Sequence, residues 1–332
     1  MTKRVDAWNE IVVQAPGKII LFGEHAVVYG QPAIAAPVTH VQTTATVAAR
    51  PAGHGLLLDL PDVQQRVPVL TENPDQPLAH VARLALQAFN VQIDPDMTLT
   101  VRSTIPVASG LGSGAAAATA IVRALAAVAG VKVTPAEVSA LVYRSEQLFH
   151  GTPSGVDNTV IAYNMPVWFV RGHAPEPFAI ARPFTLVIGD TGVPSPTAAT
   201  VGDVRRQWQA EPARLEALFA AVGDVAHAAR AAIAAGDVDA LGPLLDANQG
   251  LLQAMTVSSP ELDALCAAAR QAGALGAKLS GGGRGGNMLA LVAAEQRTAV
   301  LDALRAAGAV RAFATTVGDA GWAARGEGEI VV

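Results

Sequence analysis

The feature that most constrains this chain is a glycine- and serine-rich loop that runs directly into an alanine-rich helix. The loop spans residues 106–114 (PVASGLGSG), and the helical pattern continues from Ser113 to Ala129 before Gly130 ends it. Backbone N–H groups of such a loop can approach an anion closely, and the helix start adds unpaired N–H groups and a positive dipole end. The pattern predicts a phosphate cradle, with a plain turn before a core helix as the alternative.

The loop belongs to neither of two common nucleotide motifs. No Lys-Ser or Lys-Thr pair follows the glycines, and the Rossmann glycine spacing does not fit. The nature of the site therefore depends on what else the chain places around this loop.

Length and composition favour a globular enzyme-sized chain. Its 332 residues fit two domains with a shared cleft, and 51% of them are hydrophobic against 15% charged. The net charge is −5, and no block of Lys or Arg stands out to neutralise a nucleic-acid backbone. We therefore expect no nucleic-acid partner.

A single cysteine, Cys266, excludes an intramolecular disulfide and a cysteine-based zinc site. It lies on an apolar helical face, which predicts a buried, inert thiol. The N-terminal residues contain no apolar signal core, and the apolar runs elsewhere are too short or too rich in alanine to span a bilayer. These observations predict a cytoplasmic protein without a membrane partner.

Three different ionisable side chains, Lys18, Glu24 and His25, lie in an otherwise apolar segment near the N-terminus. Burying such groups costs free energy unless they pair with each other or meet a polar ligand. The segment therefore predicts part of a site, with an exposed hairpin end as the alternative. Around it we expect strands at 11–17, 18–23, 33–49 and 97–105, short strands within 56–70, and a helix at 77–89.

Two carboxylates follow in the middle of the chain. A helix opens at Thr134, where Pro135 and Glu137 complete a capping box, and Glu146 lies near its C-terminal end, where the helix dipole disfavours an anion. This position indicates a nearby cation, or else a solvated helix face. Asp157 ends a turn-rich loop, a common place for a working carboxylate, although an Asx-type turn cap is the alternative.

A proline-containing joint at residues 171–182 predicts the domain boundary, dividing the chain into 1–175 and 176–332. Beyond it we expect a strand from 184 and helices at 201–222, 224–235, 237–254 and 260–272. A second glycine-rich loop, 278–286, holds five glycines among its last six residues. Ordering so many glycines is costly, so the loop should closely approach a ligand or another loop.

Three separated motifs resemble the ATP-dependent kinases named for galactokinase, homoserine kinase, mevalonate kinase and phosphomevalonate kinase. They are the segment from Ala15 through Lys18 to Gly30, the 106–114 loop with its helix, and the 278–286 loop. Within this superfamily the first motif is similar to that of mevalonate kinases, since galactokinases usually carry Arg in place of Lys18. The resemblance implies an α+β fold, with an N-terminal S5-domain-2-like domain, a C-terminal ferredoxin-like domain and an ATP/substrate cleft between them.

The resemblance also implies roles for individual residues. Asp157 would accept the proton of the 5-hydroxyl of mevalonate, Lys18 would stabilise the developing charge, and Glu24 and His25 would face the substrate. Glu146 and Ser113 would hold Mg²⁺, and the resemblance favours a homodimer. The phosphates of ATP would lie against Pro106, Ser109, Gly110, Leu111, Gly112, Ser113 and Gly114.

Two positions depart from the family pattern. Gly114 stands where the family commonly has a second serine on the metal, and Arg284 interrupts the usual glycine run. Arg284 could reach a phosphate, but we expect it to point to solvent. A kinase for phosphomevalonate or another small alcohol is one alternative function. A non-catalytic ligand sensor is another, although the presence of Lys18, Glu146 and Asp157 together argues against it.

Overall fold

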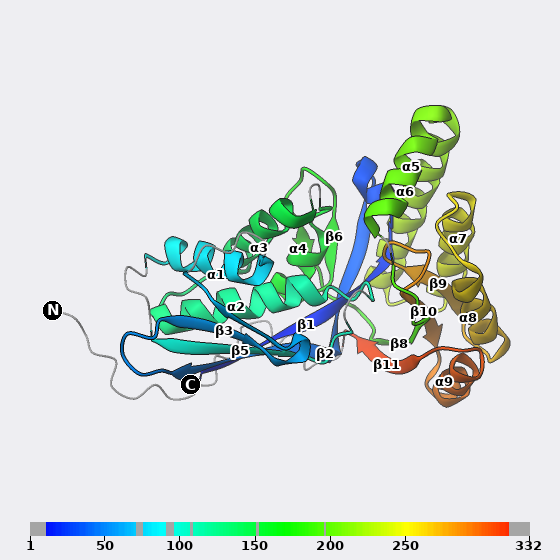
Figure 1. The fold of residues 1–332 in the computed structure, drawn as a ribbon. Coiled ribbons are helices and arrows are strands. Elements are labelled where there is room, and N and C mark those ends of the chain that lie inside the picture. The colour runs from blue at the N-terminus through cyan, green and yellow to red at the C-terminus, as the bar shows by residue number, and fades with distance from the viewer. Residues whose placement is uncertain are drawn as a thin grey trace.

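The computed structural model describes residues 11–70, 76–90, 96–106, 109–150, 153–195 and 197–318. These residues form two β-sheets, and helices pack against each of them (Figure 1). The predicted α+β class with two sheet-and-helix halves is confirmed. The boundary predicted at 175/176 stays a prediction, and the first sheet continues through Pro177 because its last strand pairs there.

The first sheet is built around β2 (Ala33–Ala49), whose 17 residues pair with three different strands. Strand order is β4-β3-β5-β2-β6-β7, with β1 also paired to β2. The strands are β1 (Ile11–Phe22), β3 (Leu56–Leu60), β4 (Gln65–Pro68), β5 (Met97–Ser103), β6 (Val167–Phe169) and β7 (Glu176–Pro177). The two strands predicted for 11–23 are wrong: β1 is continuous, and a register shift between Pro16 and Gly17 absorbs the expected turn.

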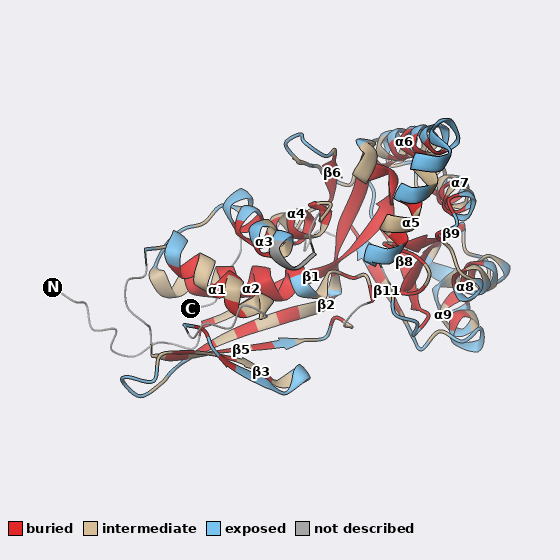
Figure 2. Cartoon of the chain, turned by 45° about the horizontal axis from the view of Figure 1, so that its top comes forward, coloured by how far each residue is buried: buried red, intermediate tan, exposed pale blue. Residues whose placement is uncertain are grey.

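Helices α1 (Pro77–Ala88), α2 (Ser113–Ala129), α3 (Pro135–His150) and α4 (Val156–Tyr163) pack beside this sheet (Figure 1). The bounds predicted for α2 are confirmed, and its small residues are buried against β1 and β2 (Figure 2). The capping box of α3 is also confirmed, since the Thr134 N–H donates to Glu137 Oε2 at 2.7 Å and the Glu137 N–H to Thr134 Oγ1 at 3.2 Å. Two short 3-10 helices, η1 (Ala26–Tyr29) and η2 (Pro61–Val63), complete this half.

The second sheet is antiparallel, in the order β11-β8-β10-β9. Its strands are β8 (Phe184–Asp190), β9 (Gly276–Ser280), β10 (Asn287–Val292) and β11 (Arg311–Val317). The accompanying helices are α5 (Thr197–Ala210), α6 (Pro212–Ala235), α7 (Leu241–Ala254), α8 (Pro260–Gln271) and α9 (Arg297–Ala306), with η3 (Ala294–Gln296) before α9.

The helix boundary predicted between residues 222 and 224 is wrong. The chain instead breaks before Pro212, which occupies the first turn of α6, where a missing N–H costs nothing. Gly223 continues the helix and lies against the side chain of Gln31, where a larger residue would clash. The glycine therefore serves packing between the two halves rather than ending a helix.

Among the described helices, α6 alone is long and apolar enough, by length and composition, to cross a membrane. Its buried residues recur along one face, at Leu215, Phe219, Val222 and Ala226. This spacing is typical of a core helix, and those residues pack into the interior of the protein. The thiol of Cys266 on α8 is buried as predicted, and burial raises its pKa to about 12.

Candidate active site

An ion pair joins Lys18 and Asp157, the two residues predicted to be catalytic. Lys18 lies on β1 and is nearly fully buried, and its Nζ is 2.8 Å from Oδ1 of Asp157 in the first turn of α4. One third of the Asp157 side chain remains exposed. The two residues to which the resemblance gives catalytic roles thus lie side by side, and we refer to Lys18 and Asp157 as the open pair because its carboxylate can meet a ligand from solvent.

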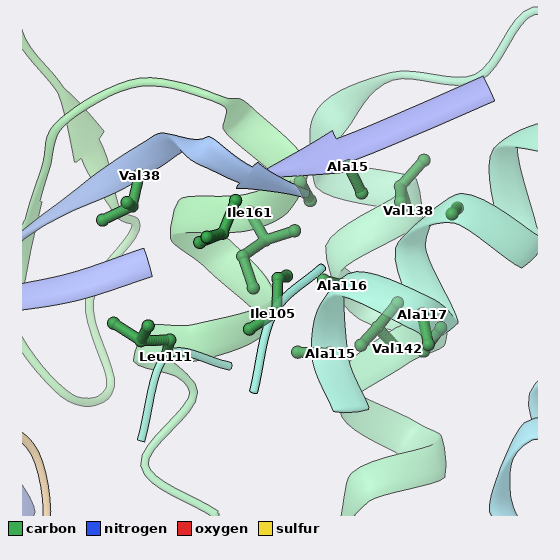
Figure 3. Packing of buried hydrophobic residues seen from close by; sticks show 14 of the residues in the cluster. Ala15, Val38, Ile105, Leu111, Ala115, Ala116, Ala117, Val138, Val142 and Ile161 are labelled. Atoms are coloured by element: carbon green, nitrogen blue, oxygen red, sulfur yellow. The ribbon is translucent and has the colours of Figure 1, made fainter. Parts of the chain in front are cut away.

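A backbone hydrogen bond holds the first glycine loop against Lys18. The Lys18 N–H donates to the carbonyl of Leu111 at 2.9 Å, and Ser109 Oγ donates to the carbonyl of Pro106 at 2.9 Å. Leu111 is buried, and Figure 3 shows it close to Ile105 and Ile161 in the packed interior. Residues 107 and 108 of this loop lie outside the described residues.

Only glycine fits at position 112. Its backbone is left-handed (φ 75°), and an added Cβ would lie 2.9 Å from Cδ1 of Ile161 and 3.0 Å from Cγ of Lys18. The loop therefore packs against the stem of Lys18 itself. The physical reason for this glycine is contact with Lys18 as well as backbone conformation.

The N-terminus of α2 is free to receive an anion. Gly112 is the N-cap and has no side chain with which to cap the helix, and the first turn contains no acidic residue. The first N–H groups of a helix have no partner within it, so those of residues 113–115 suit phosphate oxygens. Ser113 is half-buried there and Gly114 is exposed. This geometry fits the predicted phosphate cradle.

Glu146 lies on α3 within electrostatic reach of the open pair. Burial, together with the negative charge of Asp157, raises the pKa of its carboxyl to about 8, although Lys18 opposes both effects. Two carboxylates that repel each other in a half-buried place are a setting that a divalent cation stabilises. Among the described residues, no three acidic, His or Cys side chains lie close enough together to bind one metal ion. A cation here would therefore depend on few protein ligands. That suits Mg²⁺, which usually keeps water and phosphate oxygens in its shell.

Glu24 and His25 form the turn after β1, and both are buried. Glu24 is ion-paired with Nζ of Lys278 on β9. His25 Nε2 lies 3.1 Å from the carbonyl oxygen of Gly282, and burial lowers its pKa to about 4, so the imidazole is neutral at pH 7. The alternative of incidental charges on an exposed hairpin is therefore excluded. Whether the two residues contact substrate stays a prediction.

The second glycine loop meets the first, as its glycine content predicts. Nδ2 of Asn287 donates to the carbonyl of Ser109, and a Cβ at Gly286 would lie 2.9 Å from that same oxygen. Ser280 Oγ accepts from the Ile20 N–H at 3.1 Å and donates to the Ile20 carbonyl at 3.0 Å. The two halves of the molecule thus join at the site.

Sequence reasoning assigned no role to Lys278, Ser280 or Asn287. The available signal was the presence of polar side chains in two otherwise apolar strands, in the middle of β9 at Lys278, at its end at Ser280 and at the start of β10 at Asn287. Such residues must find partners when buried, and here the partners lie in the other half of the chain.

The expectation that Arg284 points to solvent is wrong. Its side chain is half-buried in an ion pair with Asp203 on α5, and its Nε donates to the carbonyl of Thr256 at 3.3 Å. The residue also has a left-handed backbone (φ 55°). Arg284 therefore ties the second glycine loop to α5 and to the segment after α7.

A pocket of about 350 Å³ lies along α3 and α4, with Tyr143, Tyr163 and Phe169 among its lining residues. None of the predicted site residues lines it. The candidate active site is thus defined by its ion pairs and glycine loops rather than by this pocket.

Two family models match the chain, one described as the GHMP kinases N terminal domain over residues 78–164 and one as GHMP kinases C terminal over residues 229–310. The chain belongs to the GHMP kinase family. It is 34% identical over 319 residues to a mevalonate kinase of Thermococcus sibiricus, covering 90% of this chain and 93% of the relative. It is 36% identical over 321 residues to a mevalonate kinase of Thermococcus gammatolerans, with the same coverage.

The fold comparison agrees with the relatives. The structure of L. major mevalonate kinase in complex with R-mevalonate matches with a TM-score of 0.82 and 31% identity, covering 96% of this chain and 99% of the other. These findings confirm the predicted resemblance to mevalonate kinases and the two-domain kinase fold. The chain is accordingly an enzyme, a kinase.

Proposed function

We propose that this kinase transfers the terminal phosphoryl group of ATP to the 5-hydroxyl of mevalonate, giving mevalonate 5-phosphate and ADP for isoprenoid precursor synthesis. The observation that carries the proposal is the open pair of Lys18 and Asp157, placed directly beside the glycine loop that begins α2. Similarity to mevalonate kinases over about nine tenths of the chain supports mevalonate as the acceptor.

Phosphoryl transfer requires mainly positioning and charge neutralisation. In this proposal the N–H groups of the loop and of the first turn of α2 orient the phosphates. The exposed carboxylate of Asp157 accepts a hydrogen bond, and then the proton, from the attacking hydroxyl. Lys18 then stabilises the negative charge that develops on the attacking oxygen, because its ammonium already lies 2.8 Å from that carboxylate.

Glu146 and Ser113 are the residues proposed to hold Mg²⁺. When bound, the ion would neutralise charge on the ATP phosphates. Because burial raises the pKa of Glu146 to about 8, its carboxyl must release a proton before it can act as a ligand. Glu146 would thus couple metal binding to the ionisation of the site.

The charges of the site favour mevalonate over phosphomevalonate. Phosphomevalonate brings an additional phosphate, which calls for further cations. The two lysines placed at the site, Lys18 and Lys278, already have carboxylate partners. A non-catalytic sensor is disfavoured because it needs no ion pair held beside a phosphate cradle.

The proposal is tested by coupled ADP release with Mg·ATP, comparing mevalonate, phosphomevalonate, galactose and homoserine for the wild type and Asp157→Asn. We expect turnover with mevalonate and its loss in the variant. If another acceptor is used instead, the kinase machinery stands and the assigned substrate is wrong. A homodimer in the cytoplasm, implied by the family resemblance, remains part of the proposal, and light scattering of the purified protein tests the dimer.

A further inference from the structure

A second lysine–carboxylate pair crosses the junction between the two halves of the molecule. Glu24 follows β1 in the first half, and Lys278 lies on β9 in the second. Their side chains are 1% and 0% exposed, so we refer to Lys278 and Glu24 as the sealed pair. Lys278 Nζ also donates to the carbonyl of Leu279 at 2.6 Å, and Glu24 Oε2 has no partner among the described residues.

This pair is not needed merely to attach the two halves. Uncharged contacts already join them, from Ser280 to the backbone of Ile20 and from Asn287 to the backbone of Ser109. A buried ion pair stabilises a protein no more than apolar residues of similar volume, because desolvation opposes the Coulomb attraction. A role in positioning accounts for its presence better than a role in stability.

The segment held by the sealed pair is strained. His25 follows Glu24 and has a positive φ (61°) with ψ −50°, which is uncommon for a residue with a side chain. Such a conformation persists only where the surroundings enforce it. Here the enforcing contacts are the ion pair at Glu24 and the 3.1 Å contact between His25 Nε2 and the carbonyl of Gly282. Lys278 thus holds the side chain of Glu24, and the carbonyl of Gly282 holds that of His25.

We propose that Lys278 is a positioning residue for the acceptor half of the site, acting through Glu24 to fix the turn that carries His25. This inference rests on the proposed function, in which the Glu24–His25 turn faces mevalonate. Lys278 is itself fully buried and does not touch the substrate. Its loss should weaken acceptor binding while leaving largely intact the phosphate cradle, which is held by Asn287 and by the backbone of Lys18.

A double-mutant cycle tests the proposal with Lys278→Met, Glu24→Gln and the combined variant. Lys132→Met, at an exposed lysine, is the matched control. We expect each single variant to raise the KM for mevalonate roughly tenfold or more and the KM for ATP less than about threefold. The combined variant should be no worse than the more damaged single variant, because residues that act as one pair are not additive.

Thermal unfolding of the same proteins gives a readout that needs no substrate. Each single variant leaves one buried charge unpaired and should lower Tm, whereas the combined variant should regain part of the loss. If Lys278→Met does not fold, the combined variant provides the test. A raised KM for mevalonate in that variant supports the positioning role of Lys278, and a KM equal to that of the wild type overturns the proposal. Equal rises in both KM values, or effects of the single variants that multiply, would also overturn it.

The wild type separates this inference from the proposed function. If the wild type phosphorylates a different acceptor, the substrate assignment fails, and the same cycle run with that acceptor still tests Lys278. If mevalonate is phosphorylated but the KM of Lys278→Met equals that of the wild type, only the inference on Lys278 fails. A wild type that phosphorylates none of the four acceptors overturns both.

Discussion

The open pair and the sealed pair are chemically alike, yet the structure places them in different surroundings. Each joins a lysine on a β-strand to a carboxylate from another segment. In the open pair, one third of Asp157 is exposed, so its carboxylate can exchange solvent for a substrate hydroxyl. In the sealed pair, neither side chain has more than 1% exposure. Exposure of the carboxylate, rather than the type of pair, distinguishes a group that can do chemistry from one that can only position others.

The neighbours of each pair explain this difference. Gly112 lies against Lys18 without a side chain, and Glu146 adds a second carboxylate nearby, so the open pair faces a polar region suited to phosphates and a cation. Around the sealed pair, burial raises the pKa of Glu24 and lowers that of Lys278, while the charge of each partner opposes these shifts. Each charge of the sealed pair therefore depends on the other.

The largest expected effect is on catalysis at the open pair. Asp157→Asn should lower kcat by about 10²- to 10⁴-fold, since it removes the group that accepts the hydroxyl proton in the proposed mechanism. Tm should fall less than in Glu24→Gln, because Asp157 is partly exposed and Asn can still accept a hydrogen bond from the buried Lys18 ammonium. Steady-state ADP release and thermal unfolding check both expectations. Glu24→Gln should instead lower Tm with little loss of kcat. If Glu24→Gln lowered kcat but kept the wild-type Tm, the two pairs would not differ in the way proposed.

The next effect concerns the glycine beside the open pair. Gly112→Ala should destabilise the protein by about 2–4 kcal/mol, because the methyl group meets Ile161 and Lys18 in a left-handed backbone. It should also lower kcat by displacing Lys18. Gly130→Ala is the matched control, since Gly130 is also left-handed (φ 66°) but has open space around its Cβ position. Chemical denaturation and kinetics of both variants test this, and equal kcat losses would refute contact with Lys18 as the cause.

A third prediction uses pH to probe the neighbour of the sealed pair. Burial lowers the pKa of His25 from 6.5 to about 4, so between these values the unfolded chain binds more protons than the folded one. The contribution of His25 to stability is therefore fully present above pH 6.5 and is lost as pH falls toward 4, by up to about 3 kcal/mol. Urea unfolding of the wild type and His25→Gln across this range should give profiles that converge at low pH. Parallel profiles would show that His25 titrates normally.

The smallest effect is expected at Gly114, at the exposed start of α2. A Cβ there meets nothing within 4 Å, so Gly114→Ala should stabilise the helix by roughly 0.5–1 kcal/mol with little change in kcat. Gly114→Ser restores the hydroxyl common in the family and should lower the Mg²⁺ concentration needed for half-maximal activity. Mg²⁺ titrations of the two variants provide the check. A lower Mg²⁺ requirement in the Ala variant as well would rule out the hydroxyl as the cause.

Much of the local structure could be predicted from the sequence because its causes are local. The bounds of α2 follow from small helix-forming residues between Gly112 and Gly130, and the start of α3 follows from the capping box at Thr134. The continuity of β1 through Pro16 and Gly17 could not be predicted, because pairing with β2 overrides the turn tendency of those two residues.

By itself the sequence determined that a glycine-rich loop precedes a helix able to hold phosphates, and its resemblance to a kinase family pointed to Lys18 and Asp157 as working residues. Only the tertiary structure decided which lysine has a partly exposed carboxylate partner and which has a fully enclosed one. Lys278 and Glu24 are 254 positions apart, and Arg284 meets Asp203 across 81 positions. Propensities act over neighbouring residues, whereas burial and charge pairing depend on which distant strands and loops come together when the two halves pack.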